Sequence, residues 1–278
     1  MLGRRSRSLL VMCASFLGLA GVACDFGASS SEQAHDCPGP VCSDTAQLSK
    51  TCTNGGLIQV GKYRILNNLW GISRSGISGE QCAWTTCNTD SGIAWGTSYE
   101  LLGGPASQVE SYTAAILGWH FGGLTPDSGL PVQISDNRRV NCNWSYRLRQ
   151  DGAATQNVAY DLWLSPNAAP GSGAASDEIM IWLNRSSAGP IGSSQGIVHV
   201  ADSDWTLYQG TNSSWNVYSF VRTSNTPCAN LNLMEFLNLL VEGYGLDGAK
   251  YLVGIEAGSE VFIGKGQLDT DSYSCEIE

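Results

Sequence analysis

The sequence predicts an all-β domain, either a sandwich or a barrel. Its 278 residues include 33 glycines and nine tryptophans, while only 14% are charged, a composition typical of β-structure with many turns and an aromatic-lined surface. Short β-prone runs recur along the chain, separated by Gly, Pro, Asn and Ser at the spacing found in sandwiches and barrels. Helical and strand-like segments do not alternate, which disfavours a parallel sheet, and all-β folds of this length form single domains.

The β-prone runs define the expected strands in chain order. They lie at residues 57–66, 92–101, 130–134, 143–148, 156–164, 178–183, 196–200, 205–209, 215–221, 251–257 and 260–263. Residues 231–246 depart from this pattern, because their apolar side chains recur at helical spacing. Asn230 can cap the start of this helix, and Gly243 or Gly245 can end it.

The N-terminal residues have the features of a signal peptide. Three arginines precede an apolar run at residues 9–23, which ends in small side chains. This run is shorter than the roughly 20 residues that a membrane-spanning helix needs. Cys24 follows directly, so a lipid anchor at Cys24 is the alternative to plain secretion, and we expect a secreted or cell-surface protein.

Composition divides the rest of the chain in two. Residues 24–50 are rich in Ser, Ala, Asp and Pro and show no apolar periodicity, so we expect a flexible linker, followed by the folded domain at residues 51–278. Without residues 1–23 the chain has 12 basic and 25 acidic side chains and a charge of −13. That charge disfavours nucleic acid and anionic membranes as partners, and we expect a monomer that acts on a neutral polymer.

The cysteines indicate disulfide bonds. If residues 1–23 are removed and Cys24 is modified, eight of the 10 cysteines remain, and an even number in an exported chain is typical of disulfides. The close pairs Cys37/Cys42 and Cys82/Cys87 either close local turns or join distant strands. A metal site is disfavoured, because only three histidines accompany these cysteines, and we expect no cofactor.

The run at residues 178–183 presents two different faces. Side chains alternate along a strand, so Glu178, Met180, Trp182 and Asn184 share one face, while apolar side chains at 179, 181 and 183 share the other. The apolar face is core. The first face suits a sugar groove, because pyranose rings stack on aromatics and their hydroxyls need polar partners. The alternative is a solvated Glu178 beside a core Trp182, and periodicity alone does not decide between them.

Two more carboxylates stand within β-prone runs, Asp161 and Glu260. Asp is disfavoured in strands, so the presence of Asp161 among strong β-formers requires an explanation. For Glu260 the alternative to a functional role is a solvated charge at the edge of the sheet. Residues 192–196 also fit the G-x-S-x-G pattern of serine hydrolases, with His199 nearby. That motif requires a helix after the turn, but residues 197–200 continue as a β-prone run, so we disfavour this chemistry.

Several segments, taken in order, resemble glycoside hydrolase family 12 endoglucanases over residues 52–278. They lie at residues 67–71, 160–162, 178–183, 189–196, 217–221 and 258–262. The resemblance implies a jelly-roll sandwich of two antiparallel sheets with one packed α-helix and an open substrate groove on the concave face. It also implies a secreted endo-acting hydrolase, a cellulase, which cleaves β-1,4-glucan with retention of configuration.

The resemblance further implies roles for single residues. Glu178 matches the family's nucleophile, Glu260 its general acid/base, and Asp161 the residue that hydrogen-bonds the nucleophile. The substrate-binding positions that it implies are Asn68, Trp70, Met180, Trp182, Tyr112 and His120. A Cys before the Asn-Asn-Leu-Trp strand pairs in the family with one after it, which here implies a disulfide between Cys52 and Cys82.

Three positions depart from the family's pattern. Val261 stands in place of a Pro, Ser259 of a Thr, and Thr113 of a Pro, which we expect to affect substrate preference more than chemistry. The alternative function is a non-catalytic carbohydrate-binding jelly roll, which has no need for the pair Glu178 and Glu260. Cellulose, mixed-linkage glucan and xyloglucan all remain open as the preferred β-glucan.

Overall fold

The computed structural model describes residues 37, 39–42, 48–74, 76–173 and 175–278. The predicted signal peptide, Cys24 and most of the predicted linker lie outside these residues, so secretion and lipidation remain predictions. In the part of the chain that is described, no helix has the length and apolar character to cross a membrane.

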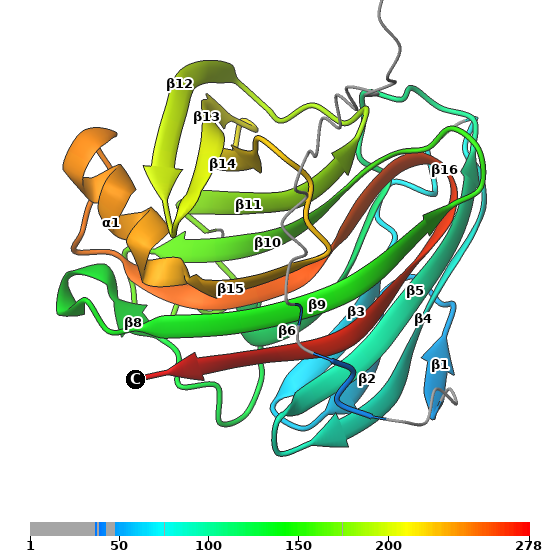
Figure 1. The fold of residues 1–278 in the computed structure, drawn as a ribbon, viewed down its shortest axis with the longest axis horizontal. Coiled ribbons are helices and arrows are strands. Elements are labelled where there is room, and N and C mark those ends of the chain that lie inside the picture. Colours follow the sequence, from blue (N-terminus) through cyan, green and yellow to red (C-terminus); the bar gives the residue numbers. More distant parts are fainter. Residues whose placement is uncertain (1–36, 38, 43–47, 75, 174) are drawn as a thin grey trace, which may run out of the picture. The chain divides into compact units, whose positions relative to one another are not determined.

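Two β-sheets packed face to face form the domain (Figure 1). The outer sheet has the order β1 (Ser49–Thr51), β4 (Ser78–Thr89), β5 (Gly92–Leu102), β16 (Tyr251–Ile277), β9 (Val140–Gln150) and β15 (Cys228–Asn232). The groove sheet has the order β2 (Gly56–Val60), β3 (Tyr63–Asn68), β6 (Ser111–His120), β16, β10 (Thr155–Ser165), β11 (Asp177–Ser186), β14 (Asn216–Arg222), β13 (Ser203–Thr211) and β12 (Ser193–Val200). The short strands β7 (Gly123–Leu124) and β8 (Val132–Gln133) pair with β6 and β16, and the 3₁₀-helix η1 (Ile134–Asp136) follows β8. The predicted sandwich is confirmed.

Strand β16 belongs to both sheets and joins them. Its residues 254–261 pair with β6 in the groove sheet, and residues 266–277 pair with β9 in the outer sheet. The predicted runs 251–257 and 260–263 are therefore parts of one strand. The opposite error occurs at residues 57–66, where a turn at Gly61, with φ of 55°, divides the predicted single strand into β2 and β3.

The strand directions contain one exception to the expected antiparallel pattern. Among the strand pairs that the structure describes, only β11 and β14 run parallel to each other. The cause is the connection between them, because the chain first forms the β12–β13 hairpin and then returns between β13 and β11.

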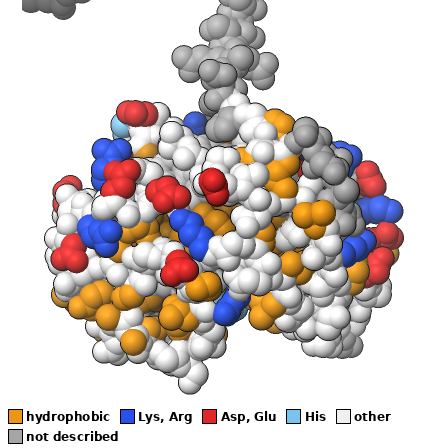
Figure 2. Space-filling model, turned by 90° about the horizontal axis from the view of Figure 1, so that it is seen from below, with side chains coloured by type: hydrophobic (Ala, Val, Ile, Leu, Met, Phe, Trp, Pro, Cys, Tyr) orange, Lys and Arg blue, Asp and Glu red, His pale blue; other side chains and the backbone are white. Residues whose placement is uncertain are grey.

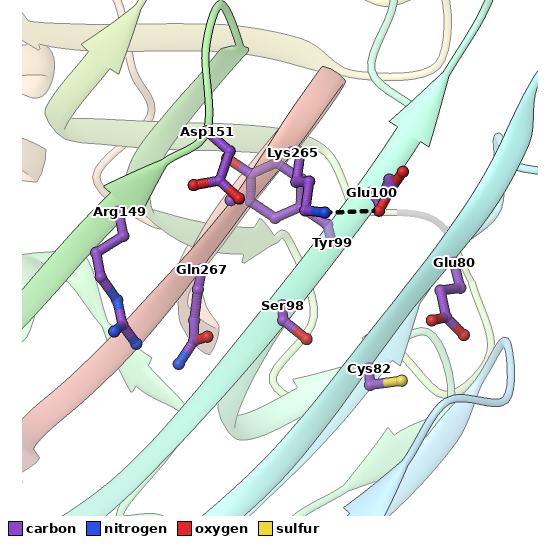
Figure 3. A pocket seen from close by; sticks show the side chains of 10 residues that line it. Glu80, Cys82, Ser98, Tyr99, Glu100, Arg149, Asp151, Lys265 and Gln267 are labelled. Atoms are coloured by element: carbon purple, nitrogen blue, oxygen red, sulfur yellow. Dashed lines mark ion pairs between the residues drawn. The ribbon is translucent and has the colours of Figure 1, made fainter.

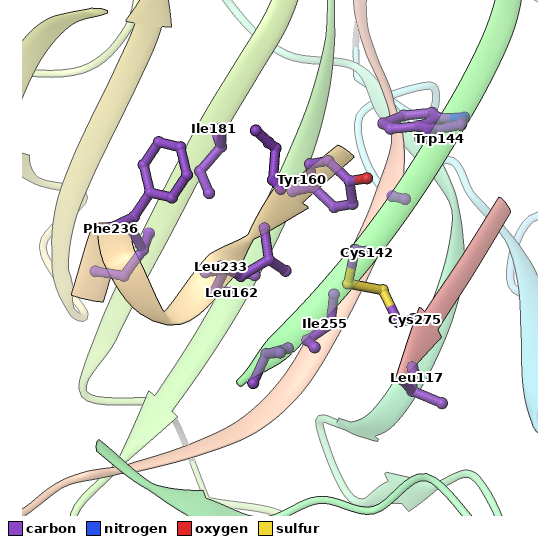
Figure 4. Close-up of a cluster of buried hydrophobic side chains, with 14 of the residues drawn as sticks. Leu117, Cys142, Trp144, Tyr160, Leu162, Ile181, Leu233, Phe236, Ile255 and Cys275 are labelled. Atoms are coloured by element: carbon purple, nitrogen blue, oxygen red, sulfur yellow. A yellow bond between two sulfur atoms is a disulfide. The ribbon is translucent and has the colours of Figure 1, made fainter. Parts of the chain in front are cut away.

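The main core lies between the two sheets (Figure 4). Ile179, Ile181 and Leu183 are fully buried in it, as the alternation along this run predicts. Burying one side chain of this size stabilises a fold by roughly 1.5–3 kcal/mol. The opposite face of β11 is thereby left free to line the groove.

The helix α1 (Leu233–Gly243) is shorter than predicted. Its N-cap is Asn232, whose side chain accepts a hydrogen bond from the Met234 amide at 3.3 Å, and not Asn230. Asn230 instead pairs with Asn143 of β9, because β15 continues as a strand up to the helix. Phe236 anchors the helix by packing edge-on against Phe220 of β14, with the ring centroids 5.0 Å apart.

Four disulfides connect the described residues: Cys37–Cys228, Cys42–Cys87, Cys52–Cys82 and Cys142–Cys275. The close pairs Cys37/Cys42 and Cys82/Cys87 thus join distant segments and do not close local turns. Cys37 and Cys42 lie within the predicted linker, so this part of it is bonded to the domain.

We call Cys37 and residues 39–42 the strap, because they cross the outer sheet from β15 to β4. Cys228 lies in β15 and Cys87 in β4, which are near opposite edges of this sheet. Between these bonds, the Val41 amide donates a hydrogen bond to the Asp271 carbonyl of β16 at 3.0 Å. The strap therefore lies on the outer sheet, with the core between it and the groove sheet.

In the face seen in Figure 2, acidic and basic side chains lie close to one another in the upper and middle parts and at the right edge, while hydrophobic side chains are conspicuous at the lower left. Ion pairs also connect neighbouring strands of the outer sheet, such as Arg147 with Asp271 at 2.7 Å and Arg149 with Asp269 at 2.7 Å. The acidic net charge is therefore not gathered into one large acidic region on this face.

Candidate active site

A groove of about 690 Å³ lies on the face of the groove sheet that points away from the core. Strands β3, β6, β10, β11, β14 and β16 contribute to it, together with the loops that follow β3 and β11. The groove brings together every residue that the sequence places in catalysis or substrate binding: Asn68, Trp70, Tyr112, His120, Asp161, Glu178, Met180, Trp182 and Glu260.

The register of three adjacent strands places the acidic side chains on one face. Asp161 of β10 lies opposite Met180 of β11 on one side and opposite Glu256 of β16 on the other. Glu178 precedes Met180 by two residues and Glu260 follows Glu256 by four, so both share this face. Four carboxyl groups therefore line one groove.

Glu178 is buried, with 9% of its surface exposed, and has one firm hydrogen bond. The Trp215 indole nitrogen donates to its Oε2 at 2.6 Å. Burial raises the pKa of Glu178 to about 7, although the hydrogen bond from Trp215 works in the opposite direction by stabilising the anion. Trp215 thus helps Glu178 to remain ionised in a poorly hydrated place.

Glu260 has different partners. Asn157 donates from its side-chain amide to Oε2 of Glu260, and its Oδ1 accepts from the Glu260 backbone amide at 3.1 Å. Burial and then the negative charge of Glu178 raise the pKa of Glu260 to about 8, against a lowering effect of Asn157. The negative charge of Glu178 therefore favours the protonated form of Glu260.

Asp161 lies in the floor of the groove with 3% of its surface exposed. Its Oδ1 has no hydrogen-bond partner among the described residues. Burial raises its pKa well above the ordinary value, and the charges of Glu178, Glu260 and Glu256 raise it further. A protonated Asp161 therefore has a proton to donate within a cluster of acceptors.

Several groove residues were not among the predicted site residues. Trp215 is the first residue of the predicted run 215–221 and lies directly before β14; alternation places it on the face of Val217 but does not indicate its partner Glu178. Trp163 and Phe121 form an aromatic cluster with it, because Trp163 meets Trp215 at 5.3 Å and Phe121 at 5.2 Å between ring centroids, both edge-on. Glu256 stands inside the apolar run 251–257, where the reasoning applied to Asp161 could have found it.

Asn184 is the one residue of the predicted polar face of β11 that does not line the groove. The pairing with β10 slips here, since Trp182 lies opposite Ala159 but Asn184 lies opposite Val158. This bulge breaks the alternation, so Asn184 no longer shares the groove face with Met180 and Trp182.

A second cavity, of about 320 Å³, lies between β4, β5, β9 and β16 (Figure 3). Both of its basic side chains already have acidic partners, as Lys265 pairs with Glu100 at 3.1 Å and Arg149 with Asp269 at 2.7 Å. None of the predicted catalytic residues lines it.

Comparison with known proteins gives a consistent result. The model of "Glycosyl hydrolase family 12" matches residues 61–278. Endoglucanase S of Pectobacterium parmentieri is 35% identical over 78% of this chain and 82% of its own length. A protein of Phytophthora nicotianae named inactive glycoside hydrolase XLP1 is 34% identical over 81% of this chain and 91% of its own. The crystal structure of the family 12 xyloglucanase from Bacillus licheniformis aligns with a TM-score of 0.74 and 34% identity, and covers 83% of this chain and all (100%) of that one.

Proposed function

Because this chain belongs to glycosyl hydrolase family 12, we propose that it is an endo-acting β-1,4-glucanase in which Glu178 is the nucleophile and Glu260 the general acid/base. The observation that supports these two roles is the unequal surroundings of two carboxyl groups in one groove. Trp215 stabilises the anion of Glu178, whereas the charge of Glu178 favours the protonated form of Glu260.

The chemistry that follows is double displacement with retention. The ionised Glu178 attacks the anomeric carbon, and Glu260 gives its proton to the leaving glycosidic oxygen. Glu260 then takes a proton from water, which displaces Glu178 from the glycosyl intermediate. Retention requires the two carboxyl groups to lie about 5–5.5 Å apart.

Neighbouring residues support these two. A protonated Asp161 can donate a hydrogen bond to Glu178 and so stabilise it as a leaving group in the second step. Asn157 fixes the carboxyl group of Glu260 through its own side chain. Trp70, which is 42% exposed, offers an indole face for a glucosyl ring, and Asn68 and Tyr112 offer polar partners beside it.

The glucan preference belongs to this proposal as well. The names of the relatives cover endoglucanases and xyloglucanases, so both linear glucan and xyloglucan are substrates to test. A product profile on cellulose, mixed-linkage glucan and xyloglucan distinguishes them. Four disulfides among the described residues suit an enzyme that acts outside the cytosol.

The decisive test must separate hydrolysis from binding, because one relative bears the name of an inactive hydrolase. We expect Glu178→Gln to reduce glucan hydrolysis by roughly 1000-fold or more while glucan binding persists, since the amide keeps the shape but loses the nucleophile. Reducing-sugar release and affinity electrophoresis in β-glucan gels measure the two properties. Glu242→Gln, on the exposed side of α1, is the matched control. Full hydrolysis by Glu178→Gln would refute the assignment.

The general acid is tested through the leaving group. We expect Glu260→Gln to lose most of its activity on glucan, yet to keep far more on aryl glycosides with acidic phenols, which leave without protonation. Rates on a series of aryl cellobiosides measure this. A uniform loss across the series would contradict the role of Glu260 as acid.

A further inference from the structure

Glu256 is a groove carboxylate that the proposed reaction leaves without a role. It is 1% exposed and lines the groove on β16, four residues before Glu260. A buried carboxylate without compensation is costly, so partners must account for its position.

Two donors meet at the same oxygen of Glu256. Nδ1 of His120, at the end of β6, lies 2.6 Å from Oε1, and Nε1 of Trp163 donates to the same atom at 2.6 Å. Trp163 in turn packs edge-on against Trp215, which donates to Glu178. A continuous set of contacts therefore connects Glu256 with the nucleophile.

The charges around Glu256 are strongly unbalanced. It faces Asp161 from β10, Glu178 from β11, Glu260 from its own strand, and Tyr112 and His120 from β6. Arg74 also lines the groove, but it is paired with Glu110 at 3.1 Å. Among the described groove residues, His120 is thus the basic side chain that can compensate an acid of the catalytic cluster.

We propose that His120 and Glu256 form a positioning ion pair, in which His120 cancels the charge of Glu256 and so keeps Glu178 ionised, while Glu256 fixes Trp163. The inference rests on the proposed catalytic roles and adds two positioning residues to them. The pKa of His120 supports it, because burial would lower this pKa, yet the charge and hydrogen bond of Glu256 outweigh burial and raise it. The charge of Glu256 also raises the pKa of Glu178, so an uncompensated Glu256 would disfavour the ionised nucleophile.

Opposite effects of the two single substitutions test the pair. His120→Asn keeps a hydrogen-bond donor but removes the positive charge, so the acidic limb of the kcat/KM profile should move to higher pH by about 0.5–1 unit. Glu256→Gln removes the negative charge, so that limb should move to lower pH by a similar amount. The double variant should return close to the wild-type profile, because both charges are gone.

The chain offers a matched control. His199 lies 2.7 Å from Asp204 in an exposed pair on the β12–β13 hairpin, away from the groove. His199→Asn should leave the profile unchanged. The proposal would be overturned in favour of a structural role if both single variants lost activity at every pH and the acidic limb of their kcat/KM profiles did not move in opposite directions.

An activity-independent measurement separates this proposal from the catalytic assignment. The chain contains three histidines, so ¹⁵N-edited NMR of the imidazoles can follow the titration of His120 directly. In Glu256→Gln the pKa of His120 should fall below its wild-type value, whereas Asp204→Asn should not change it. An unchanged His120 titration in Glu256→Gln would refute the ion pair even if Glu178 is the nucleophile. If the pKa of His120 falls in Glu256→Gln but the wild-type protein does not hydrolyse glucan, only the proposed hydrolysis is refuted and the ion pair stands.

Discussion

Glu178 and Glu260 are the same amino acid in the same groove, and their neighbours alone distinguish them. An indole donor meets Glu178, whereas an amide and the charge of Glu178 act on Glu260. The shared burial raises the pKa of both, which has a thermodynamic consequence. A folded state that holds ionised carboxylates in a poorly hydrated groove is less stable than the same fold with neutral groups there.

This cost gives a prediction for stability against pH. The pKa of Glu178 is raised from 4.5, its ordinary value, to about 7 in the folded protein. The contribution of this carboxyl group to the free energy of unfolding is therefore fully present below pH 4.5, where the group is protonated in both states, and is lost as the pH rises through about 7. Glu178→Gln should therefore increase the free energy of unfolding by about 1–3 kcal/mol at pH 8 and leave it nearly unchanged at pH 4. Urea unfolding at both pH values measures this. Equal stability of the two proteins at pH 8 would contradict the raised pKa.

At the residue scale, the family resemblance located the carboxylates Glu178, Glu260 and Asp161, and the structure brings all three into one groove. Alternation along a strand explains why Met180 and Trp182 join them. Glu256 could have been noticed as a carboxylate within an apolar run, but its role, like that of Trp215, depends on a partner more than 35 residues away: His120 at 136 for Glu256 and Glu178 at 37 for Trp215. Only the fold makes such neighbours visible.

Among the elements, β16 has the largest structural role, since it pairs with strands of both sheets. Gly264 lies where it passes from one sheet to the other, with φ of 120°, and a Cβ at this position would come within 2.6 Å of Cβ of Ala154. Only glycine adopts this conformation without strain. The transition therefore depends on a residue without a side chain.

We expect Gly264→Ala to destabilise the fold by about 2–4 kcal/mol, because it adds backbone strain to a close contact. Gly248→Ala is the control, since its φ is ordinary and its new Cβ would find only van der Waals contacts at 3.5 Å or more. Thermal unfolding of both variants measures the difference. Similar melting temperatures for the two would contradict the role of Gly264.

The errors in the predicted elements have physical causes. Strand β6 was missed because it is buried almost throughout, on one face by the core and on the other by the groove, which hides the alternation of a half-exposed strand. Strand β4 was missed because Gly, Glu, Gln and Cys dominate its first half. The helix start was misplaced by two residues because Asn230 and Asn232 are equally good caps, and only the pairing of β15 decides between them.

For the whole molecule, the spacing of the strands predicted an all-β sandwich or barrel and the family resemblance implied the sandwich, but neither predicted the connection of the strap. An even number of cysteines indicates disulfides without identifying their partners. Composition suggested a linker at residues 24–50, yet Cys37 and Cys42 are bonded to β15 and to β4. These bonds depend on the order of strands in the outer sheet, which no local pattern encodes.

The strap should contribute to stability and not to catalysis. Replacing Cys37, Cys42, Cys87 and Cys228 by serine removes both bonds, and we expect a loss of roughly 2–5 kcal/mol in the free energy of unfolding. At 25 °C kcat/KM should remain within twofold of wild type, because the core separates the strap from the groove. Denaturant unfolding and glucan kinetics measure the two effects. A large fall in kcat/KM of the folded variant would show that the outer sheet influences the reacting groups.

The route of the strap also determines on which side of the domain an N-terminal attachment would lie. The polypeptide reaches the domain at Cys37, behind the outer sheet, so a tether upstream of this residue would pull on the reverse side of the catalytic face. In a molecule attached from that side, the groove would open away from the attachment point. A polymeric substrate would then reach the groove without passing between the domain and the surface that carries it.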